Sequence, residues 1–253
     1  MIDHPNIYDT GRVCPRCGEH ILAFRMFYDG RVREFEKPCA CRDAEIKAED
    51  AENAARKHEA ARQARRQWAE IPEMFSAATL KGYRRLPGTE QAFETLKDYL
   101  LNREENFQAG CGLILMGAVG CGKTHLGCAI LNCALENGYC AAYWNVPQQL
   151  ELLMPGNASD TDQMHILDKA MLAHVLLLDD LGAEKSSEWT RKELMIILDE
   201  RYRGQKPTII TSNLMLTDDE LRQTCGDRAY SRLCSDHYQA VALTAADYRR
   251  KKS

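Results

Sequence analysis

The 253-residue sequence lacks three features that would place it in other classes of protein. Its first residues contain neither a basic segment nor an apolar stretch, so we expect no secretory leader. No apolar run approaches the roughly 18 residues that span a membrane as a helix. A net positive charge is also missing, because the formal charge is -4 and the pI is about 6.0. We therefore expect a cytoplasmic protein without a membrane partner, in which any contact with nucleic acid comes from local patches.

Apolar residues make up 45% of the chain, which is enough for a sizeable core. The length allows one full α/β domain beside a smaller unit. The 11 cysteines are unevenly distributed, because four of them fall within the first 41 residues and the others are scattered through apolar or loop contexts. This distribution indicates a metal site in a reducing compartment and argues against a disulfide scaffold.

Residues 1–42 predict a small zinc-ribbon-like domain. Two cysteine pairs are candidate metal ligands: Cys14 and Cys17 have the C-x-x-C spacing typical of such sites, and Cys39 and Cys41 have the shorter C-x-C spacing. Between the pairs, residues 21–28 and 31–37 alternate apolar and polar side chains around the favoured hairpin turn Asp29-Gly30. A hairpin that brings four thiolates together is the layout of a Zn²⁺ site. The alternative is a hairpin with free reduced thiols, and His20 is a possible substitute ligand.

Residues 43–70 predict a charged linker helix, since this stretch has neither glycine nor proline and is rich in strong helix formers. Acidic residues crowd its first half and basic residues its second half, as suits the helix dipole. Its alanine stripe is too thin to bury in a core, so the helix is either a solvated spacer or a partner-binding segment. Pro72 ends the helix, and residues 71–253 form the large domain.

A phosphate-binding loop lies in the large domain. Eight consecutive residues fit G-x-x-x-x-G-K-[ST]: Gly117, Ala118, Val119, Gly120, Cys121, Gly122, Lys123 and Thr124. The apolar run 112–116 precedes the loop as a buried strand and 125–135 follows it as a helix, which is the context that the motif requires. Lys123 would reach the β- and γ-phosphates, Thr124 would bind Mg²⁺, and His125 is the last predicted nucleotide-binding residue.

A second nucleotide signature follows the apolar run 175–178, which ends in the carboxylate pair Asp179 and Asp180. A fully apolar strand is typical of a buried parallel sheet, and its carboxyl end opens onto the site. Asp179 would hold Mg²⁺. Asp180 stands where many such ATPases carry the glutamate that orients the attacking water, and its shorter side chain puts efficient hydrolysis in question. Glu184 is a second candidate for that base.

Three polar residues farther along are candidates for contacts with the γ-phosphate. The strand 208–212 leads to Asn213, which either contacts the γ-phosphate or the attacking water, or merely forms a turn. Arg228 and Arg232 share one helical face. They either neutralise the γ-phosphate of a neighbouring subunit, or they are solvated or contact an acidic surface.

In their order and spacing, these motifs resemble the DnaC-like and IstB-like branch of the AAA+ ATPases over residues 71–253. The resemblance implies a five-stranded parallel sheet and Mg²⁺-dependent ATP hydrolysis at subunit interfaces. It also implies Asn213 as the sensor and Arg232 as the arginine finger, with Arg228 in support. No helical lid domain is evident after Leu243, and the helicase loaders of this family also lack one.

Loaders of this family grip a DnaB-type replicative helicase hexamer with a variable N-terminal region, and their ATPase domain binds single-stranded DNA. We therefore expect a bacterial or phage helicase loader that self-associates through its ATP site. One alternative is an IstB-type transposition helper that binds target DNA, although such proteins usually have a metal-free N-terminus. The other alternative is an adaptor that is switched by nucleotide binding and hydrolyses little ATP. It is motivated by aspartate at position 180, where many such ATPases carry glutamate.

Overall fold

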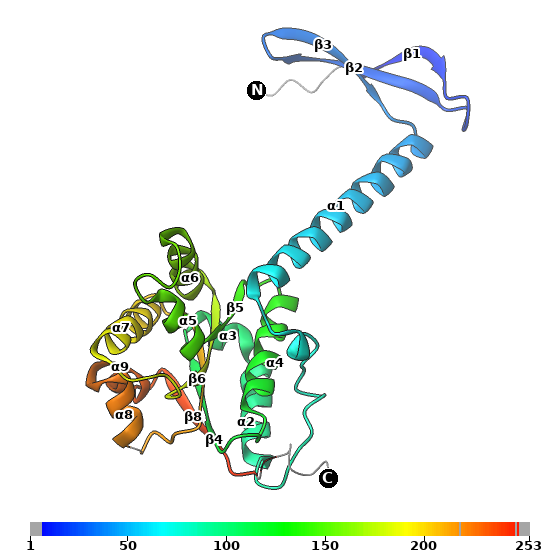
Figure 1. Ribbon diagram of the computed structural model, residues 1–253. Coiled ribbons are helices and arrows are strands. Elements are labelled where there is room, and N and C mark those ends of the chain that lie inside the picture. Colours follow the sequence, from blue (N-terminus) through cyan, green and yellow to red (C-terminus); the bar gives the residue numbers. More distant parts are fainter. Residues whose placement is uncertain (1–6, 218, 246, 248–253) are drawn as a thin grey trace. The chain divides into compact units, whose positions relative to one another are not determined.

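The computed structural model describes residues 7–217, 219–245 and 247 (Figure 1). The chain forms two compact units, 1–61 and 62–253, which divide within helix α1 (Ala40–Ala69). The boundaries that the sequence predicts, after residues 42 and 70, lie near the two ends of this helix. Helix α1 begins before the expected Asp43 because the Glu19 carboxylate accepts a hydrogen bond of 2.9 Å from the Ala40 backbone N–H at the start of the helix.

The first unit is built on an antiparallel sheet with the strand order β1-β2-β3. Its strands are β1 (Ile7–Val13), β2 (His20–Tyr28) and β3 (Arg31–Lys37). The predicted hairpin is present, and Asp29 and Gly30 both have a positive φ, 53° and 73°, as a two-residue hairpin turn requires. Only Ala23 is fully buried in this sheet, so the unit has almost no apolar core of its own.

The second unit contains a five-stranded parallel sheet, as predicted. Its strands are β4 (Gly112–Gly117), β5 (Ala141–Asn145), β6 (Val175–Leu181), β7 (Thr208–Ser212) and β8 (Tyr238–Leu243). Their order in the sheet is β5-β6-β7-β4-β8, so β7 lies between β4 and β6. Because the strands are parallel, the residues that follow β4, β6 and β7 meet at one edge.

Helices cover both faces of this sheet, and the sheet separates two apolar cores (Figure 1). Leu113 and Leu115 face one layer, whereas Ile114 and Met116 face the other, since side chains alternate along a strand. The first layer comprises the 3-10 helix η1 (Glu73–Phe75), α2 (Glu90–Leu101), α3 (Arg103–Gln108) and α4 (Lys123–Glu136). The second layer comprises α5 (Val146–Leu153), α6 (Asp160–Leu172), α7 (Glu188–Arg203), α8 (Asp219–Cys225) and α9 (Asp227–Leu233).

Helix α6 is the main difference from the sequence-based expectation, which predicts only a polar loop at 155–160. Ser159 caps the helix by accepting a hydrogen bond of 3.2 Å from the Asp162 backbone N–H. After β8, the described residues 244, 245 and 247 belong to no helix or strand, and the basic stretch 249–252 lies outside the described part. None of the helices in the described ranges has the length and apolar character needed to span a membrane.

Candidate functional site

The phosphate-binding loop connects β4 to α4 at the carboxyl edge of the sheet. Gly122 caps the N-terminus of α4 with a φ of 95°, a conformation that favours glycine. A Cβ atom at Gly122 would lie 2.6 Å from the Tyr83 ring, and the Tyr83 hydroxyl donates to the Cys121 carbonyl at 2.9 Å. Tyr83 therefore holds the loop in place, a role that the sequence does not predict.

Lys123 joins the loop to strand β7. Its side chain is buried, and Nζ donates to the carbonyl oxygens of Gly117 (2.8 Å) and Ala118 (2.9 Å) and to Oδ1 of Asn213 (2.9 Å). The structure therefore brings the predicted lysine and the predicted asparagine together. Because all three acceptors are neutral, phosphate oxygens would be stronger partners for the ammonium group.

Asp179 is a buried carboxylate that accepts hydrogen bonds from three hydroxyl groups. Oδ1 accepts from Thr124 at 2.9 Å and from Thr211 at 2.7 Å, and Oδ2 accepts from Tyr143 at 2.8 Å. Burial, together with the charge of Asp179, raises the pKa of Tyr143 and keeps its hydroxyl a donor. Thr211 and Tyr143 were not predicted as site residues, and they reach Asp179 only because β5 and β7 flank β6.

The geometry at Thr124 and Asp179 fits a Mg²⁺ ion. Thr124 Oγ1 and Asp179 Oδ1 are 2.9 Å apart. Adjacent ligands of an octahedral Mg²⁺ with bonds of about 2.1 Å lie about 3.0 Å apart. The two oxygens can therefore occupy neighbouring positions around such an ion.

Asp180 sits in an irregular part of β6. The register between β6 and β7 shifts between Leu178 and Leu181, and Asp180 has a φ of 61°, which is rare for a residue with a side chain. Its backbone N–H donates to Thr211 Oγ1 at 2.9 Å. This bulge gives the two aspartates different environments: Asp179 is buried, whereas Asp180 is half-buried at the carboxyl edge of the sheet.

Glu184, the second candidate for the base, is bound to its own loop. Its Oε2 accepts from the Gly182 backbone N–H at 2.8 Å, while its Oε1 is buried without a hydrogen-bond partner among the described residues. Burial raises the pKa of this carboxyl group. Glu184 is therefore already engaged within its own loop.

His125 lies beside the phosphate loop and faces the segment that precedes α2. Its Nε2 is 3.2 Å from the Thr79 carbonyl oxygen, and its ring packs against Tyr83 with the centroids 5.8 Å apart. The ring of Phe75 meets it edge-on at 6.5 Å. These contacts form an aromatic wall next to the loop.

The two predicted arginines lie on α9 and make no polar contact with the phosphate loop in the described part of the chain. Arg232 pairs with Asp199 on α7 at 2.9 Å. Arg228 is exposed, and none of the described residues forms a hydrogen bond or an ion pair with it. Within one chain, therefore, the structure joins Lys123 to Asn213 and Thr124 to Asp179, and in the described part neither arginine makes a polar contact with these four residues.

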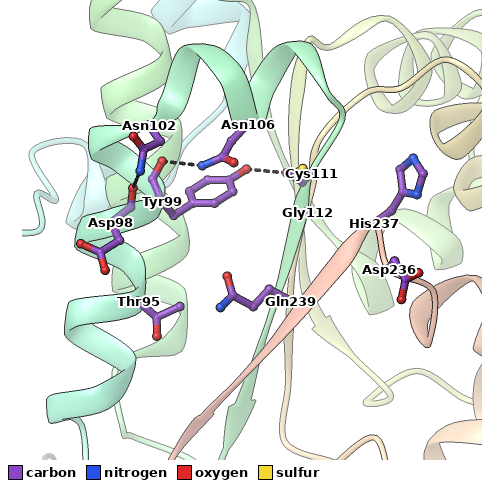
Figure 2. A pocket seen from close by; sticks show the side chains of 10 residues that line it. All are labelled: Thr95, Asp98, Tyr99, Asn102, Asn106, Cys111, Gly112, Asp236, His237 and Gln239. Atoms are coloured by element: carbon purple, nitrogen blue, oxygen red, sulfur yellow. Dashed lines mark hydrogen bonds between the residues drawn. The ribbon is translucent and has the colours of Figure 1, made fainter.

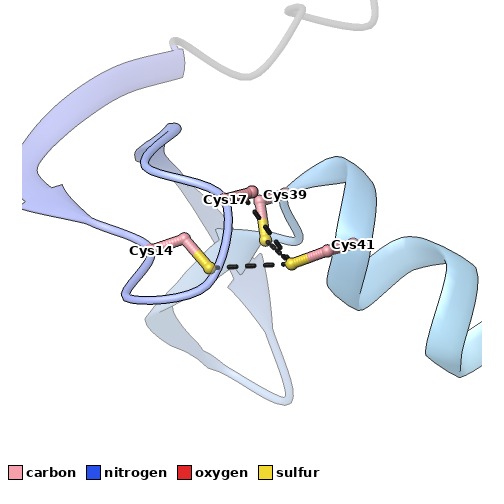
Figure 3. Close-up of side chains that lie close together, drawn as sticks. All are labelled: Cys14, Cys17, Cys39 and Cys41. Carbon is pink, nitrogen blue, oxygen red and sulfur yellow. Dashed lines mark hydrogen bonds between the residues drawn. The ribbon is translucent and has the colours of Figure 1, made fainter.

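The four predicted cysteines converge in the first unit (Figure 3). All four sulfur atoms lie within 4.8 Å of one another, and Sγ of Cys41 is 3.6 Å from those of Cys14 and Cys17 and 3.2 Å from that of Cys39. A tetrahedral Zn²⁺ with Zn–S bonds of about 2.3 Å places its ligands about 3.8 Å apart. The backbone N–H groups of Cys17 and Arg16 lower the pKa of Cys14 to about 6, whereas hydrogen bonds with the thiols of Cys39 and Cys14 raise the pKa of Cys41 to about 12. Without a metal the cluster therefore holds a thiolate at Cys14 that the other thiols stabilise.

His20 is not part of this cluster. Its Nδ1 atom lies 2.7 Å from the carboxylate of Asp9, on the neighbouring strand. The donor set that fits a metal is therefore four sulfur atoms.

A separate hollow of about 380 Å³ lies at the opposite, amino edge of the large sheet (Figure 2). Helix α2 and the starts of β4 and β8 line it. Its polar groups bond to one another, because the Tyr99 hydroxyl donates to the Cys111 carbonyl at 2.6 Å and Asn106 donates to the Tyr99 carbonyl at 2.9 Å. This hollow is not part of the nucleotide site.

Three features define an AAA+ P-loop protein: a glycine loop between β4 and α4, an aspartate at the end of β6, and strand β7 placed between β4 and β6. Residues 52–253 match the family described as IstB-like ATP binding protein, and the chain belongs to this family.

Two kinds of relative are similar to this chain in sequence. The replicative helicase loader DnaI of Bacillus subtilis (strain 168) is 33% identical over 137 residues, 54% of this chain and 43% of the relative. The putative ATP-binding protein of insertion sequence IS1162 from Pseudomonas fluorescens is 36% identical over 102 residues, 40% of this chain and 43% of the relative. Each match thus spans less than half of the relative's own length.

The fold is similar to the crystal structure of the DnaC helicase loader. The TM-score is 0.57 at 26% sequence identity, and the match covers 68% of this chain and 99% of that one. The DnaC-like branch of AAA+ proteins that the motifs resemble is therefore supported by both sequence and fold.

Proposed function

We propose that this protein is an ATP-dependent loader that places a DnaB-type replicative helicase on single-stranded DNA. The observation that carries the proposal is the match of its AAA+ unit to a helicase loader structure over 99% of that loader's chain. The similarity to the DnaI loader supports the same function. ATP binding would drive assembly of the loader on the helicase, and hydrolysis would release it.

The nucleotide site supplies the chemistry for this cycle. The loop 117–124 and Lys123 would bind the phosphates of ATP, while Thr124 and Asp179 would hold the Mg²⁺ that neutralises charge on the transferred phosphate. Asp180 would orient the attacking water. Asn213, which already bonds Lys123, would sense the γ-phosphate.

A neighbouring copy would complete the site. The arginines of one chain make no polar contact with its own phosphate loop, so we assign Arg232, supported by Arg228, to the γ-phosphate of the next subunit. Self-association through the ATP site would then be necessary for efficient turnover. An isolated chain is expected to bind ATP yet hydrolyse it poorly.

The first unit would bind Zn²⁺ through its four cysteines and serve as the region that grips the helicase. Because that unit buries almost no apolar core, the metal would supply much of its stability. The AAA+ unit would contact the single-stranded DNA.

A second candidate function follows from the similarity to the IS1162 protein, which is 36% identical over its matched segment. On this alternative the chain is a transposition helper that binds target DNA. The two functions require different partners, namely a helicase hexamer and a duplex.

A pull-down with purified replicative helicase distinguishes these functions. The full-length chain is expected to retain the helicase when ATP is present, and Lys123→Ala is expected to weaken this retention because it removes the phosphate contact. Strong binding to duplex DNA without any binding to helicase would instead establish the transposition helper. ATP turnover that is equally low for the wild type and Lys123→Ala would identify an adaptor that does not depend on hydrolysis.

A further inference from the structure

Arg232 is clamped by two side chains of helix α7. Its Nε and Nη2 atoms both donate to Oδ1 of Asp199, at 3.2 and 2.9 Å. The guanidinium carbon lies 4.6 Å from the centre of the Tyr202 ring. One carboxylate oxygen and one aromatic face therefore restrain the rotation of the guanidinium plane.

The clamp is itself supported by neighbouring residues. The Asp199 side chain is only 14% exposed, and its other oxygen, Oδ2, is 2.7 Å from Nη2 of Arg203. The ring of Tyr202 packs on that of His237, with the centroids 4.6 Å apart. Asp199 and Tyr202, which hold Arg232, are therefore themselves held in place by Arg203 and His237.

One edge of the Arg232 guanidinium stays available. Nη1 has no partner among the described residues, and the side chain is 36% exposed. Among the described residues, Arg228, one turn earlier on α9, has neither a carboxylate nor a ring against it. Arginine carries about 2 kcal/mol of rotamer entropy, so a restrained arginine loses less on meeting a ligand than an unrestrained one.

We propose that Asp199 and Tyr202 are positioning residues that preorganise Arg232, with its Nη1 edge free, for the γ-phosphate of ATP on a neighbouring copy. This inference rests on the proposed function, in which two neighbouring copies form each ATP site together. A donor that is already oriented needs no reorganisation when charge develops on the phosphate. Arg228 takes a secondary part, because nothing orients it.

Steady-state ATP turnover by the full-length chain tests this role. Asp199→Ala is expected to lower kcat by about tenfold or more while leaving KM for ATP within about twofold, since the arginine acts in the transition state. Asp199→Asn keeps an oxygen that accepts both N–H groups, so it should retain most of the activity. The matched control is Asp227→Ala, which removes another ion pair of α9, with Arg222, and should leave kcat unchanged.

An increase in turnover for Asp199→Ala would overturn the proposal, because it would mean that Asp199 holds Arg232 back. Unchanged turnover would overturn it as well. Equal losses for Asp199→Ala and Asp199→Asn would also count against it, since the amide preserves the geometry.

Mixing experiments separate this inference from the proposed function. Lys123→Ala chains lose their own ATP site but keep a positioned arginine, so adding them to Asp199→Ala chains should raise turnover above the sum of the two alone. Adding Arg232→Ala chains to Asp199→Ala chains should give no gain. If Lys123→Ala chains rescue Arg232→Ala but not Asp199→Ala, only the role of Asp199 fails. If they rescue neither variant, the shared site fails and the inference falls with it.

Discussion

At the residue scale, the carboxylate of Asp179 is buried, so its charge needs compensation. Burying a carboxylate costs several kcal/mol unless hydrogen bonds compensate it. Three hydroxyl donors do so here, and each comes from a different element: α4, β5 or β7. The same bonds orient Oδ1 toward Thr124, so stabilising the charge would also prepare the proposed Mg²⁺ site.

Tyr143→Phe should therefore raise the Mg²⁺ concentration needed for half-maximal ATP turnover by about threefold to tenfold. A hydrogen bond to a charged group contributes about 1.5–3 kcal/mol, and only part of this free energy would act on metal binding. A Mg²⁺ titration of ATP turnover measures this shift. Tyr139→Phe is the control, because the Tyr139 hydroxyl has no hydrogen-bond partner among the described residues. A shift of equal size in the control would contradict the role of Tyr143.

Gly122→Ala should abolish ATP binding and lower the melting temperature. A Cβ atom would lie 2.6 Å from Tyr83 in a backbone conformation with a φ of 95°. Gly138 offers a matched control, because its φ is 86° but nothing lies within 4 Å of an added Cβ. Gly138→Ala should thus cost only about 1 kcal/mol of backbone strain and leave ATP binding intact. Normal ATP binding by Gly122→Ala would refute this account of the loop.

Glu184 should make stability depend on pH. Burial raises its pKa in the folded chain above the ordinary value of 4.5, so folding favours the protonated form. The raised pKa therefore adds to the free energy of unfolding fully below about pH 4.5, and this contribution is lost as the pH rises through the raised pKa. Glu184→Gln cannot ionise and should gain stability over the wild type at neutral pH, an advantage that shrinks toward pH 4.5.

Melting temperatures from pH 4.5 to 8 measure this difference, with the exposed Glu151→Gln as the control. An advantage of Glu184→Gln that is the same at every pH would contradict the assignment to ionisation.

At the scale of elements, the sequence predicts the large sheet and most helices because their apolar spacing is strong. The predicted strands 112–116, 175–178 and 208–212 and the hairpin of the first unit appear where the pattern predicts them. Strand β1 (Ile7–Val13) and helix α6 (Asp160–Leu172) were missed, because both are largely exposed and carry little apolar periodicity. The beginning of α1 depends on a side chain from another strand, which spacing alone does not reveal.

The sequence motifs predict the phosphate and Mg²⁺ contacts but not the residues that support them. Tyr143 and Thr211 act through the order of β5, β6 and β7, which no local pattern specifies. The left-handed backbone at Asp180 follows from the bulge in β6 and is likewise invisible in composition. The pairing of Arg232 with Asp199 joins two helices that lie far apart in sequence.

The first unit provides the prediction at this scale. Metal analysis of the purified chain should find one Zn²⁺ per chain, and a chelator should unfold β1–β3 while the AAA+ unit keeps its cooperative melting transition. Cys17→Ser should have the effect of the chelator. Substoichiometric zinc in a chain whose first unit is folded would remove the zinc assignment.

At the scale of the whole molecule, the chain combines a small unit around four cysteines with an AAA+ unit. On the proposed function, a neighbouring copy completes the ATP site of that unit. The family match covers residues 52–253 and therefore bears chiefly on the second unit. Helicase loading would depend on both units, because one would select the partner and the other would couple ATP to assembly.

The central claim is that this chain uses ATP to place a replicative helicase on DNA. The most direct measurement is the amount of helicase hexamer that becomes stably bound to closed circular single-stranded DNA, which offers no end for threading. The account predicts that the wild-type chain with ATP increases this amount and that Lys123→Ala does not. Helicase binding to the circle that is the same with and without the chain would contradict the account.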